Sequence, residues 1–446
     1  MLAKLNIAWY WVRSSFWFIP TLMVLGAIGL AEVSLRLDNA LLPDTLESLH
    51  WIYAGSAEGA RQLLATIAGS MITVAGVVFS ITIVALTLAS SQFGPRILRN
   101  FMSDKGNQVV LGVFIATFLY CLLVIRTVRG KGEGNGLFVP HLSTTLGVAL
   151  ALVCLGFLIY YIHHVSSSLQ VDDILGGIAG GLKREGEGRL PEEVGRPWNQ
   201  ARADGGLPDG KPMEIPAGES GYLQSIDFVG LYRFAIKCKA VVDILYRPGE
   251  FVIKDTPLLR LWSKDASLDA AERTLKPLFI LGAHRTPTQD YSFKINLLVE
   301  IAVRALSPSI NDPFTALMCI DRLGEALIPM AGRPPPRSTI ADDENNLRIH
   351  FRPVPYTELL SQALDLIRHY GATNPMVAQR VLQVLKLALE RAKSPETIAA
   401  LSDHARRFAR ENGWSDPADR DRVLEAYGGF LEVRKEIQRS QESLVP

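Results

Sequence analysis

The stretch TIAGSMITVAGVVFSITIVALTLASSQ, residues 66–92, decides the class of fold to which this chain belongs. It is long and apolar enough to cross the hydrocarbon core of a bilayer, which needs roughly 20 helical residues. It contains no Asp, Glu, Lys or Arg. Small and hydroxylated residues recur in it at spacings of three, four or seven, which places them on one face of a helix. We call this face the small-polar stripe, and its members are Thr66, Gly69, Thr73, Gly76, Ser80 and Thr87.

The small-polar stripe allows two interpretations. Small residues let two helices approach closely, and hydroxyls can bond back to their own helix, so the stripe can be a helix–helix contact. Alternatively, it can line the water-filled path of a pore that several copies of the chain form together. The span holds no carboxylate, which argues against a proton relay inside it.

Three further stretches have the length and apolar character of membrane helices. The first is preceded by Lys4 and Arg13 but has no small-residue cleavage site, so it predicts a retained helix and not a signal peptide. The stretch quoted above belongs to the second span in chain order. The four predicted spans are residues 15–35, 63–90, 108–126 and 142–165. The sequence therefore predicts a membrane domain of four helices over residues 1–170.

The distribution of basic residues predicts how these spans are oriented. The N-terminal tail is basic, residues 38–48 are acidic, and Lys105 follows the second span together with two arginines. By the positive-inside rule both termini are expected in the cytoplasm. The third connection, with Arg126, Arg129 and Lys131, contradicts this orientation.

Charged and titratable residues lie where two of the spans end. After Gly94 and Pro95, Arg96 and Arg99 fit ordinary positive-inside anchoring, or a positive collar at the cytoplasmic mouth of a pore. At the end of the fourth span, His163 and His164 fit interfacial anchoring, with pH sensing as the alternative.

Composition excludes several classes of protein. The 446 residues are 48% hydrophobic and carry a net charge of +1, so no broad basic surface is available for nucleic acid. The four cysteines are far apart and form no CxxC pair. We expect no metal and no cofactor.

The remainder of the chain predicts three regions. Residues 171–212 are rich in Gly, Pro and charge and are predicted to be an exposed linker whose start can still be helical. Residues 213–264 contain short strands around a helix near 230–239, which predicts a small β-barrel or sandwich-like module. Residues 265–446 show helical spacing, including 268–285, and only 346–354 resembles a strand. We therefore expect an α+β region that ends in a helical bundle.

The segment IAVRALSPSINDPFTAL, residues 301–317, is predicted to turn a corner between two helices. Ser307 before Pro308 and Asp312 before Pro313 both fit an N-cap followed by proline at the first helical position, which predicts two helix starts in tandem. The polar residues around it predict helix caps and internal salt bridges, or a ligand site or subunit interface. The candidates are Arg285, Asp290, Arg304, Ser307, Asn311, Asp312 and Asp321. No catalytic residue is expected.

Three segments together resemble one protein family. They are residues 89–124, 160–173 and 304–317, which read ASSQFGPRILRNFMSDKGNQVVLGVFIATFLYCLLV, YYIHHVSSSLQVDD and RALSPSINDPFTAL. In this order they resemble the bacterial membrane proteins grouped as domain of unknown function 2254, over nearly the whole chain. The resemblance implies a bacterial inner-membrane protein with an N-terminal multi-span region and a cytoplasmic C-terminal half. It carries no known activity.

These observations favour a homo-oligomeric ion channel or channel-like transporter. The small-polar stripe would line its path, its cytoplasmic region would gate it, and an inorganic ion or small cytoplasmic ligand would be its partner besides the lipid bilayer. The alternative is a non-conducting membrane scaffold or sensor that binds a cytoplasmic partner or ligand. An enzyme ranks last, because the spans show no paired carboxylates, metal-spaced histidines or activated nucleophile.

Overall fold

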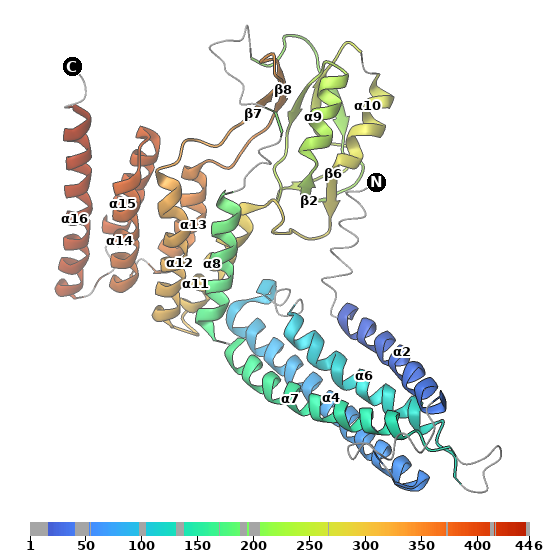
Figure 1. The fold of residues 1–446 in the computed structure, drawn as a ribbon. Helices are drawn as coiled ribbons and strands as arrows, with labels where there is room; N and C mark the ends of the chain where they lie inside the picture. Colours follow the sequence, from blue (N-terminus) through green and yellow to red (C-terminus); the bar gives the residue numbers. More distant parts are fainter. Residues whose placement is uncertain are drawn as a thin grey trace. The chain divides into compact units, whose positions relative to one another are not determined.

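The computed structural model describes most of the chain, in two units. The described residues are 17–40, 53, 55–97, 104–130, 138–168, 170–187, 194–195, 206–265, 267–371, 373–410, 414 and 416–442. The units are Met1–Asp173 and Ile174–Pro446 (Figure 1).

The first unit contains the predicted membrane helices. They are α2 (Phe18–Ala40), α4 (Ala57–Phe93), α6 (Lys105–Ile125) and α7 (His141–Ser168). Each is long and apolar enough to cross a membrane, so the four predicted spans are helices that are candidates to do so. α6 lies against α2, α4 and α7 and is the most enclosed of the four. α4 has 37 residues, so it is about 55 Å long at 1.5 Å per residue and exceeds the roughly 30 Å hydrocarbon core.

Local chemistry sets the ends of these helices. α4 begins after Ser56, whose hydroxyl accepts the Gly59 N–H at 3.2 Å, and it ends at Gly94, whose φ of +102° lies outside the range that L side chains favour. α6 begins after Asp104, whose carboxylate accepts the Gly106 N–H at 2.8 Å. At the other end of α6, Asp38 of α2 accepts the N–H groups of Leu142 and Ser143 and so caps α7.

Most of α8 (Val171–Glu187) belongs to the second unit, and the start of the predicted linker is therefore helical. One face of this helix is buried through Leu175, Ile178 and Leu182. Glycines allow close contact with the helical bundle, because a Cβ at Gly181 would come within 2.6 Å of the Lys294 ammonium nitrogen.

The predicted small β-barrel is wrong, because the described strands form two open sheets. One has the order β1-β5-β3-β8-β7 and the other β4-β2-β6, and of their pairings only β3 with β8 is parallel. Each sheet therefore keeps two edge strands. The strands are β1 (Met213–Pro216), β2 (Gly221–Ile226), β3 (Val241–Ile244), β4 (Phe251–Val252), β5 (Pro257–Trp262), β6 (Phe279–Gly282), β7 (Thr339–Ala341) and β8 (Leu347–His350).

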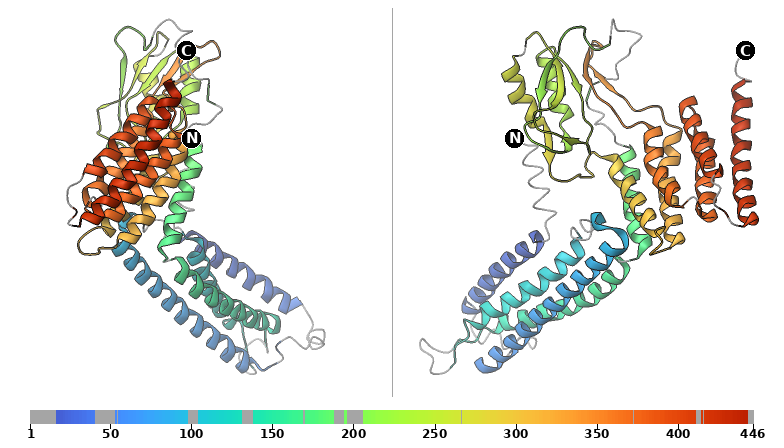
Figure 2. Two further views of the ribbon diagram at one scale, coloured as in Figure 1. Left: turned by 90° about the vertical axis from the view of Figure 1, so that its left-hand side faces the viewer. Right: turned by 180° about the vertical axis from the view of Figure 1, so that it is seen from behind.

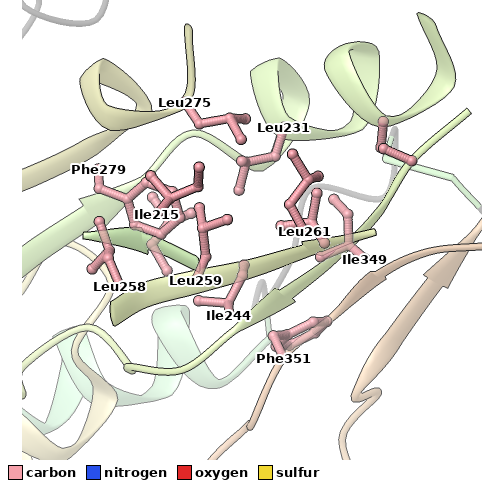
Figure 3. Packing of buried hydrophobic residues seen from close by; sticks show 14 of the residues in the cluster. Ile215, Leu231, Ile244, Leu258, Leu259, Leu261, Leu275, Phe279, Ile349 and Phe351 are labelled. Atoms are coloured by element: carbon pink, nitrogen blue, oxygen red, sulfur yellow. The ribbon is translucent and has the colours of Figure 1, made fainter. Parts of the chain in front are cut away.

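Two helices and the sheets enclose one hydrophobic core. α9 (Phe228–Lys237) and α10 (Leu268–Leu275) direct Leu231 and Leu275 toward Leu259 and Leu261 of β5 (Figure 3). Ile349 of β8 joins them from more than 70 residues further along the sequence.

The prediction that the stretch 268–285 is helical is wrong for its second half. α10 is followed by a 3-10 turn, Lys276–Leu278, with Pro277 inside it, and then by β6, in which Phe279 pairs with Ile226 of β2. Proline cannot supply the N–H that a continuing helix needs, so the apolar residues after it are free to form a strand.

The predicted helical bundle is confirmed. α11 packs against α12 and α13, α12 against α14, and α14 against α15 and α16 (Figure 2). Prolines stand at the first position of several of these helices, where a missing N–H costs nothing. The helices are α11 (Tyr291–Ala305), α12 (Pro313–Ala331), α13 (Tyr356–Gly371), α14 (Pro375–Arg391), α15 (Pro395–Arg410) and α16 (Pro417–Glu442).

Candidate functional site

α4 has one buried face, which packs against α6 and α7. Leu64, Ala68, Ala75, Val78 and Thr82 lie on it at helical spacing and are all buried. Most of them are small, so α6 and α7 approach the α4 backbone closely. The first unit thus covers this side of α4 with its own helices.

The small-polar stripe lies on the opposite side of α4. All six members, Thr66, Gly69, Thr73, Gly76, Ser80 and Thr87, are exposed in the chain by itself. Apart from the helix's own backbone, no atom of the described residues lies within 4 Å of where a Cβ would stand on Gly69 or Gly76. At 100° per residue the stripe is centred about 155° from the buried face. The described residues of its own unit therefore do not pack against it.

Each hydroxyl of the stripe bonds to its own helix. Thr66, Thr73, Ser80 and Thr87 donate to the carbonyl four residues earlier, at 2.8 to 2.9 Å. The hydroxyl hydrogen is therefore occupied, while the oxygen keeps a lone pair that can accept a bond from outside. Large apolar side chains border the stripe on both sides, with Ile72, Phe79 and Ile83 on one and Val77 and Val84 on the other.

Beyond the stripe, α4 ends in a short 3-10 turn, Pro95–Ile97. Arg96 lies in this turn and is exposed. Arg99 lies outside the described residues, so the arginine collar stays a prediction.

Two buried tyrosines tie the four helices together, and the sequence predicted this role for neither: Tyr161 was expected to be an interfacial anchor and Tyr120 was given no role. Tyr161 of α7 donates to the Val78 carbonyl at 2.8 Å and lies 2.8 Å from the Thr82 hydroxyl. Tyr120 of α6 donates to the Ser143 carbonyl at 3.0 Å and lies 3.1 Å from the Ser34 hydroxyl. A tyrosine in the middle of an apolar run is the signal, because its hydroxyl needs a partner when it is buried.

The two adjacent histidines at the end of α7, His163 and His164, lie in different environments. The His164 Nε2 lies 2.6 Å from an Asp104 carboxylate oxygen, and the Tyr160 ring stacks on the imidazole with centroids 5.3 Å apart. His163 is exposed. The sequence predicted the same role, interfacial anchoring, for both histidines, whereas the structure pairs only His164 with the residue that caps α6.

The corner between α11 and α12 contains one helix start and not two. The Asp312 cap is confirmed, because its carboxylate accepts the Thr315 N–H at 3.1 Å. The predicted start at Pro308 is wrong. Ser307 donates its hydroxyl to the Arg304 carbonyl at 2.7 Å, and the N–H of Asn311 closes a turn on the Ser307 carbonyl at 2.9 Å. Asn311 has a φ of +48°, which ends any helical path before Asp312.

The polar residues predicted around this corner do not gather into one site. Arg285 and Asp290 pair at 2.6 Å before the start of α11, where Asp290 is 3% exposed and also caps Phe293. The corner lies at the other end of α11, which has 15 residues and so spans about 22 Å. Asp321 lies two turns into α12, 3.5 Å from Arg380 of α14. Only Arg304, Ser307, Asn311 and Asp312 share the corner.

The pair of Arg285 and Asp290 clamps a turn of the β-rich region. Gly249 of that turn has a φ of +94°, and a Cβ there would collide with the Asp290 carboxylate. The neighbouring Arg247 donates to Glu358 of α13 at 2.7 Å. These contacts connect the sheets to the bundle.

Burial changes the chemistry of two groups in the bundle. Burial, with a smaller contribution from Asp312, raises the pKa of the Cys319 thiol to about 12. His404 is 4% exposed, and burial lowers its pKa.

His404 of α15 also completes a Ser/His/Asp grouping that the sequence did not reveal. The Ser361 hydroxyl lies 3.3 Å from Nε2 of His404, and the Asp365 carboxylate lies 3.9 Å from Nδ1, both from α13. The second distance exceeds that of a hydrogen bond. Because Ser361 and Asp365 stand in the middle of a helix, the nearby backbone N–H groups are already bonded and offer no oxyanion hole. The grouping is therefore better described as a helix contact that contains a buried imidazole.

Within the described ranges, no group of three or more His, Cys, Asp or Glu side chains is placed to hold a metal ion. The first unit offers the stripe, the tyrosine ties and the Asp104–His164 pair among its polar features. Comparison with known proteins places these features in a family.

The sequence profile described as "Predicted membrane protein (DUF2254)" matches residues 13–387. The chain belongs to this family. The match spans all four membrane helices and continues into α14, so the DUF2254 region includes the stripe, both sheets and the corner.

Uncharacterized proteins of Mycobacterium tuberculosis and Mycobacterium bovis are similar to this DUF2254 chain. Each is 31% identical over 436 residues, which cover 95% of this chain and 81% of the relative. The similarity therefore reaches past the end of the DUF2254 profile. No solved structure matches the chain.

Proposed function

We propose that this DUF2254 protein is a homo-oligomeric ion channel or channel-like transporter of the bacterial inner membrane. α4 of each copy lines the path, and the region after α7 gates it from the cytoplasm, where both termini lie. One observation carries the proposal: the small-polar stripe occupies the side of α4 that the described residues of its own unit leave uncovered. The proposal assigns no catalytic residue, cofactor or metal to the chain, and no nucleic-acid partner.

The chemistry of the stripe supports water on this side of α4. Because each hydroxyl hydrogen is donated to the helix, the oxygen faces outward as an acceptor. Acceptor oxygens can replace part of the hydration shell of an inorganic ion, as polar rings do in channels. Gly69 and Gly76 would widen the path at their positions, because they carry no side chain. A ring of copies would bring these faces to a shared axis.

A second candidate is a non-conducting membrane scaffold or sensor, and one observation favours it. Hydroxyls that are satisfied by their own helix can also lie in a dry contact or against lipid at little cost. In that case the stripe packs two copies together, and the second unit binds a cytoplasmic partner or small ligand.

Single-channel recording in planar bilayers distinguishes the two. The test variants are Thr73→Leu and Ser80→Leu, which place bulky apolar groups on the stripe. The controls are Ile72→Leu and Ile81→Leu, because each is the chain neighbour of a test residue and points about 100° away from it. We expect the test variants to reduce conductance several-fold and the controls to leave it near the wild-type value.

Two results would oppose conduction through the stripe. Equal currents in wild type and in both test variants would remove the stripe from the path. A purified protein that passes no ions in liposomes, yet retains a stable cytoplasmic partner, would favour the scaffold.

A further inference from the structure

One end of the helical bundle joins two helix connections. The corner between α11 and α12 lies there, and so does the connection between α13 and α14. The two are in contact, because a Cβ at Gly371 would come within 2.8 Å of the Leu306 side chain and 3.0 Å of Val377. Segments near residues 306 and 371 thus lie side by side.

Large apolar side chains are exposed at this end of the bundle. Phe314 is 67% exposed, the highest value of any large hydrophobic residue described in the second unit, and Ile310 is 45% exposed. Tyr370 and Met376, from the neighbouring connection, are also exposed. We call these four residues the apolar end. A gathering of this kind differs from single apolar residues scattered over a soluble surface.

The chain enters the second unit at the apolar end. Gly181 of α8 lies beside Lys294, which is about 17 Å before the end of α11 at 1.5 Å per residue. Val171 is ten residues before Gly181, or about 15 Å. Since α8 runs beside α11, with its first turn toward the corner (Figures 1 and 2), α8 starts level with the apolar end.

The segment before α8 is a candidate membrane span. α7 ends at Ser168 and α8 begins at Val171, so at most about 10 Å of extended chain separates them. Covalent connection alone therefore keeps the start of α8 close to the end of a span.

We propose that the apolar end inserts into the interfacial layer of the bilayer that α7 spans, so that its partner is lipid. Apolar side chains of interfacial elements reach roughly 5–10 Å into the boundary between headgroups and acyl chains. Tyrosine prefers this layer because one end of its side chain is apolar and the other polar. α8 carries Asp172 and Asp173 in its first turn, so apolar burial and not attraction to anionic headgroups drives the contact.

Photo-crosslinking tests the proposal on the full-length protein. p-Benzoyl-phenylalanine replaces Phe314 in one variant and Tyr370 in another, and each protein is irradiated in vesicles of phosphatidylethanolamine and phosphatidylglycerol. The negative control carries the same group at Phe251 of β4, which is exposed to a similar extent as Tyr370. The positive control carries it at Leu25, an exposed residue of the α2 span. Adducts are identified by mass spectrometry.

We expect lipid adducts at positions 314, 370 and 25, in yields several-fold above that at 251 and insensitive to 0.5 M salt. The proposal is overturned if position 25 yields lipid adducts and position 314 does not. It is also overturned if position 314 crosslinks to protein, either its own chain or a second copy. The proposal requires that the spans cross a bilayer but not that they conduct, so a failure of the conductance test leaves it standing.

Discussion

Burial decides how the cysteines of this chain behave. Cys319 is fully enclosed in α12, and its thiol has a pKa of about 12. Only the thiolate reacts readily with electrophiles. At pH 8 a group with such a pKa is ionised in roughly one molecule in 10⁴. Cys238, at the end of α9, is partly exposed.

We therefore predict that Cys319 resists maleimide in the native protein while Cys238 is labelled. Peptide mass spectrometry after a short treatment at pH 8 measures both in one sample. Unfolding in dodecyl sulfate provides the control, since it should make the two thiols react at similar rates. Equal labelling in the native protein would contradict the enclosed position of Cys319.

At the level of secondary-structure elements, the contact between α13 and α15 should make the stability of the protein depend on pH. Burial lowers the pKa of His404, so the folded protein favours the neutral imidazole. The unfolded chain takes up the proton first, near pH 6.5, the ordinary pKa of histidine. The free energy of unfolding is therefore unaffected by this group above that pH, and it falls as the pH drops further, by at most about 1.4 kcal/mol per pH unit.

Thermal unfolding of the detergent-solubilised protein between pH 7.5 and 5.5 measures this effect. We expect His404→Gln to lower stability at pH 7.5 but to flatten its decline toward acid. His369→Gln is the matched control, because His369 is an exposed residue of α13 and should leave the slope unchanged. If both variants follow the wild-type slope, His404 does not sense pH.

The four candidate membrane helices could be predicted because their signal is local. Each span is a continuous apolar run, and a bilayer imposes its length. The N-cap at Asp312 could be predicted for the same reason, since the capping residue, the proline and the following helix are adjacent in sequence.

The sheets could not be predicted in full because their pairing is not local. β8 pairs in parallel with β3 through Val242 and Ile349, which are over 100 residues apart. The two strands are not joined by a short turn whose sequence could predict the pairing. β6 follows α10 so closely that its apolar residues read as a continuation of that helix. The grouping of Ser361, Asp365 and His404 depends on how α13 meets α15, which a single sequence does not reveal.

At the scale of the whole molecule, the second unit has a hydrophobic core of its own. Its sheets enclose Ile215, Leu231 and Leu259 (Figure 3), and its bundle buries one face of each helix. α8 belongs to this unit, because Leu175 and Leu182 are buried and Gly181 contacts Lys294. Burying a leucine side chain contributes roughly 1.5–3 kcal/mol. Removing α8 should therefore lower the stability of the unit without abolishing its fold.

We predict that a fragment of residues 171–446, made without the spans, folds and unfolds in one cooperative urea transition. A fragment of residues 206–446 lacks α8 and should unfold at lower urea, because the surface that α8 covers becomes exposed to water. A matched variant, Leu175→Ala with Leu182→Ala in the longer fragment, separates lost packing from lost chain length and should lie between the two. If the longer fragment shows no cooperative transition, the second unit depends on the membrane helices for its fold. If both fragments unfold at the same urea concentration, α8 contributes nothing to the bundle, and its apolar face must be satisfied elsewhere.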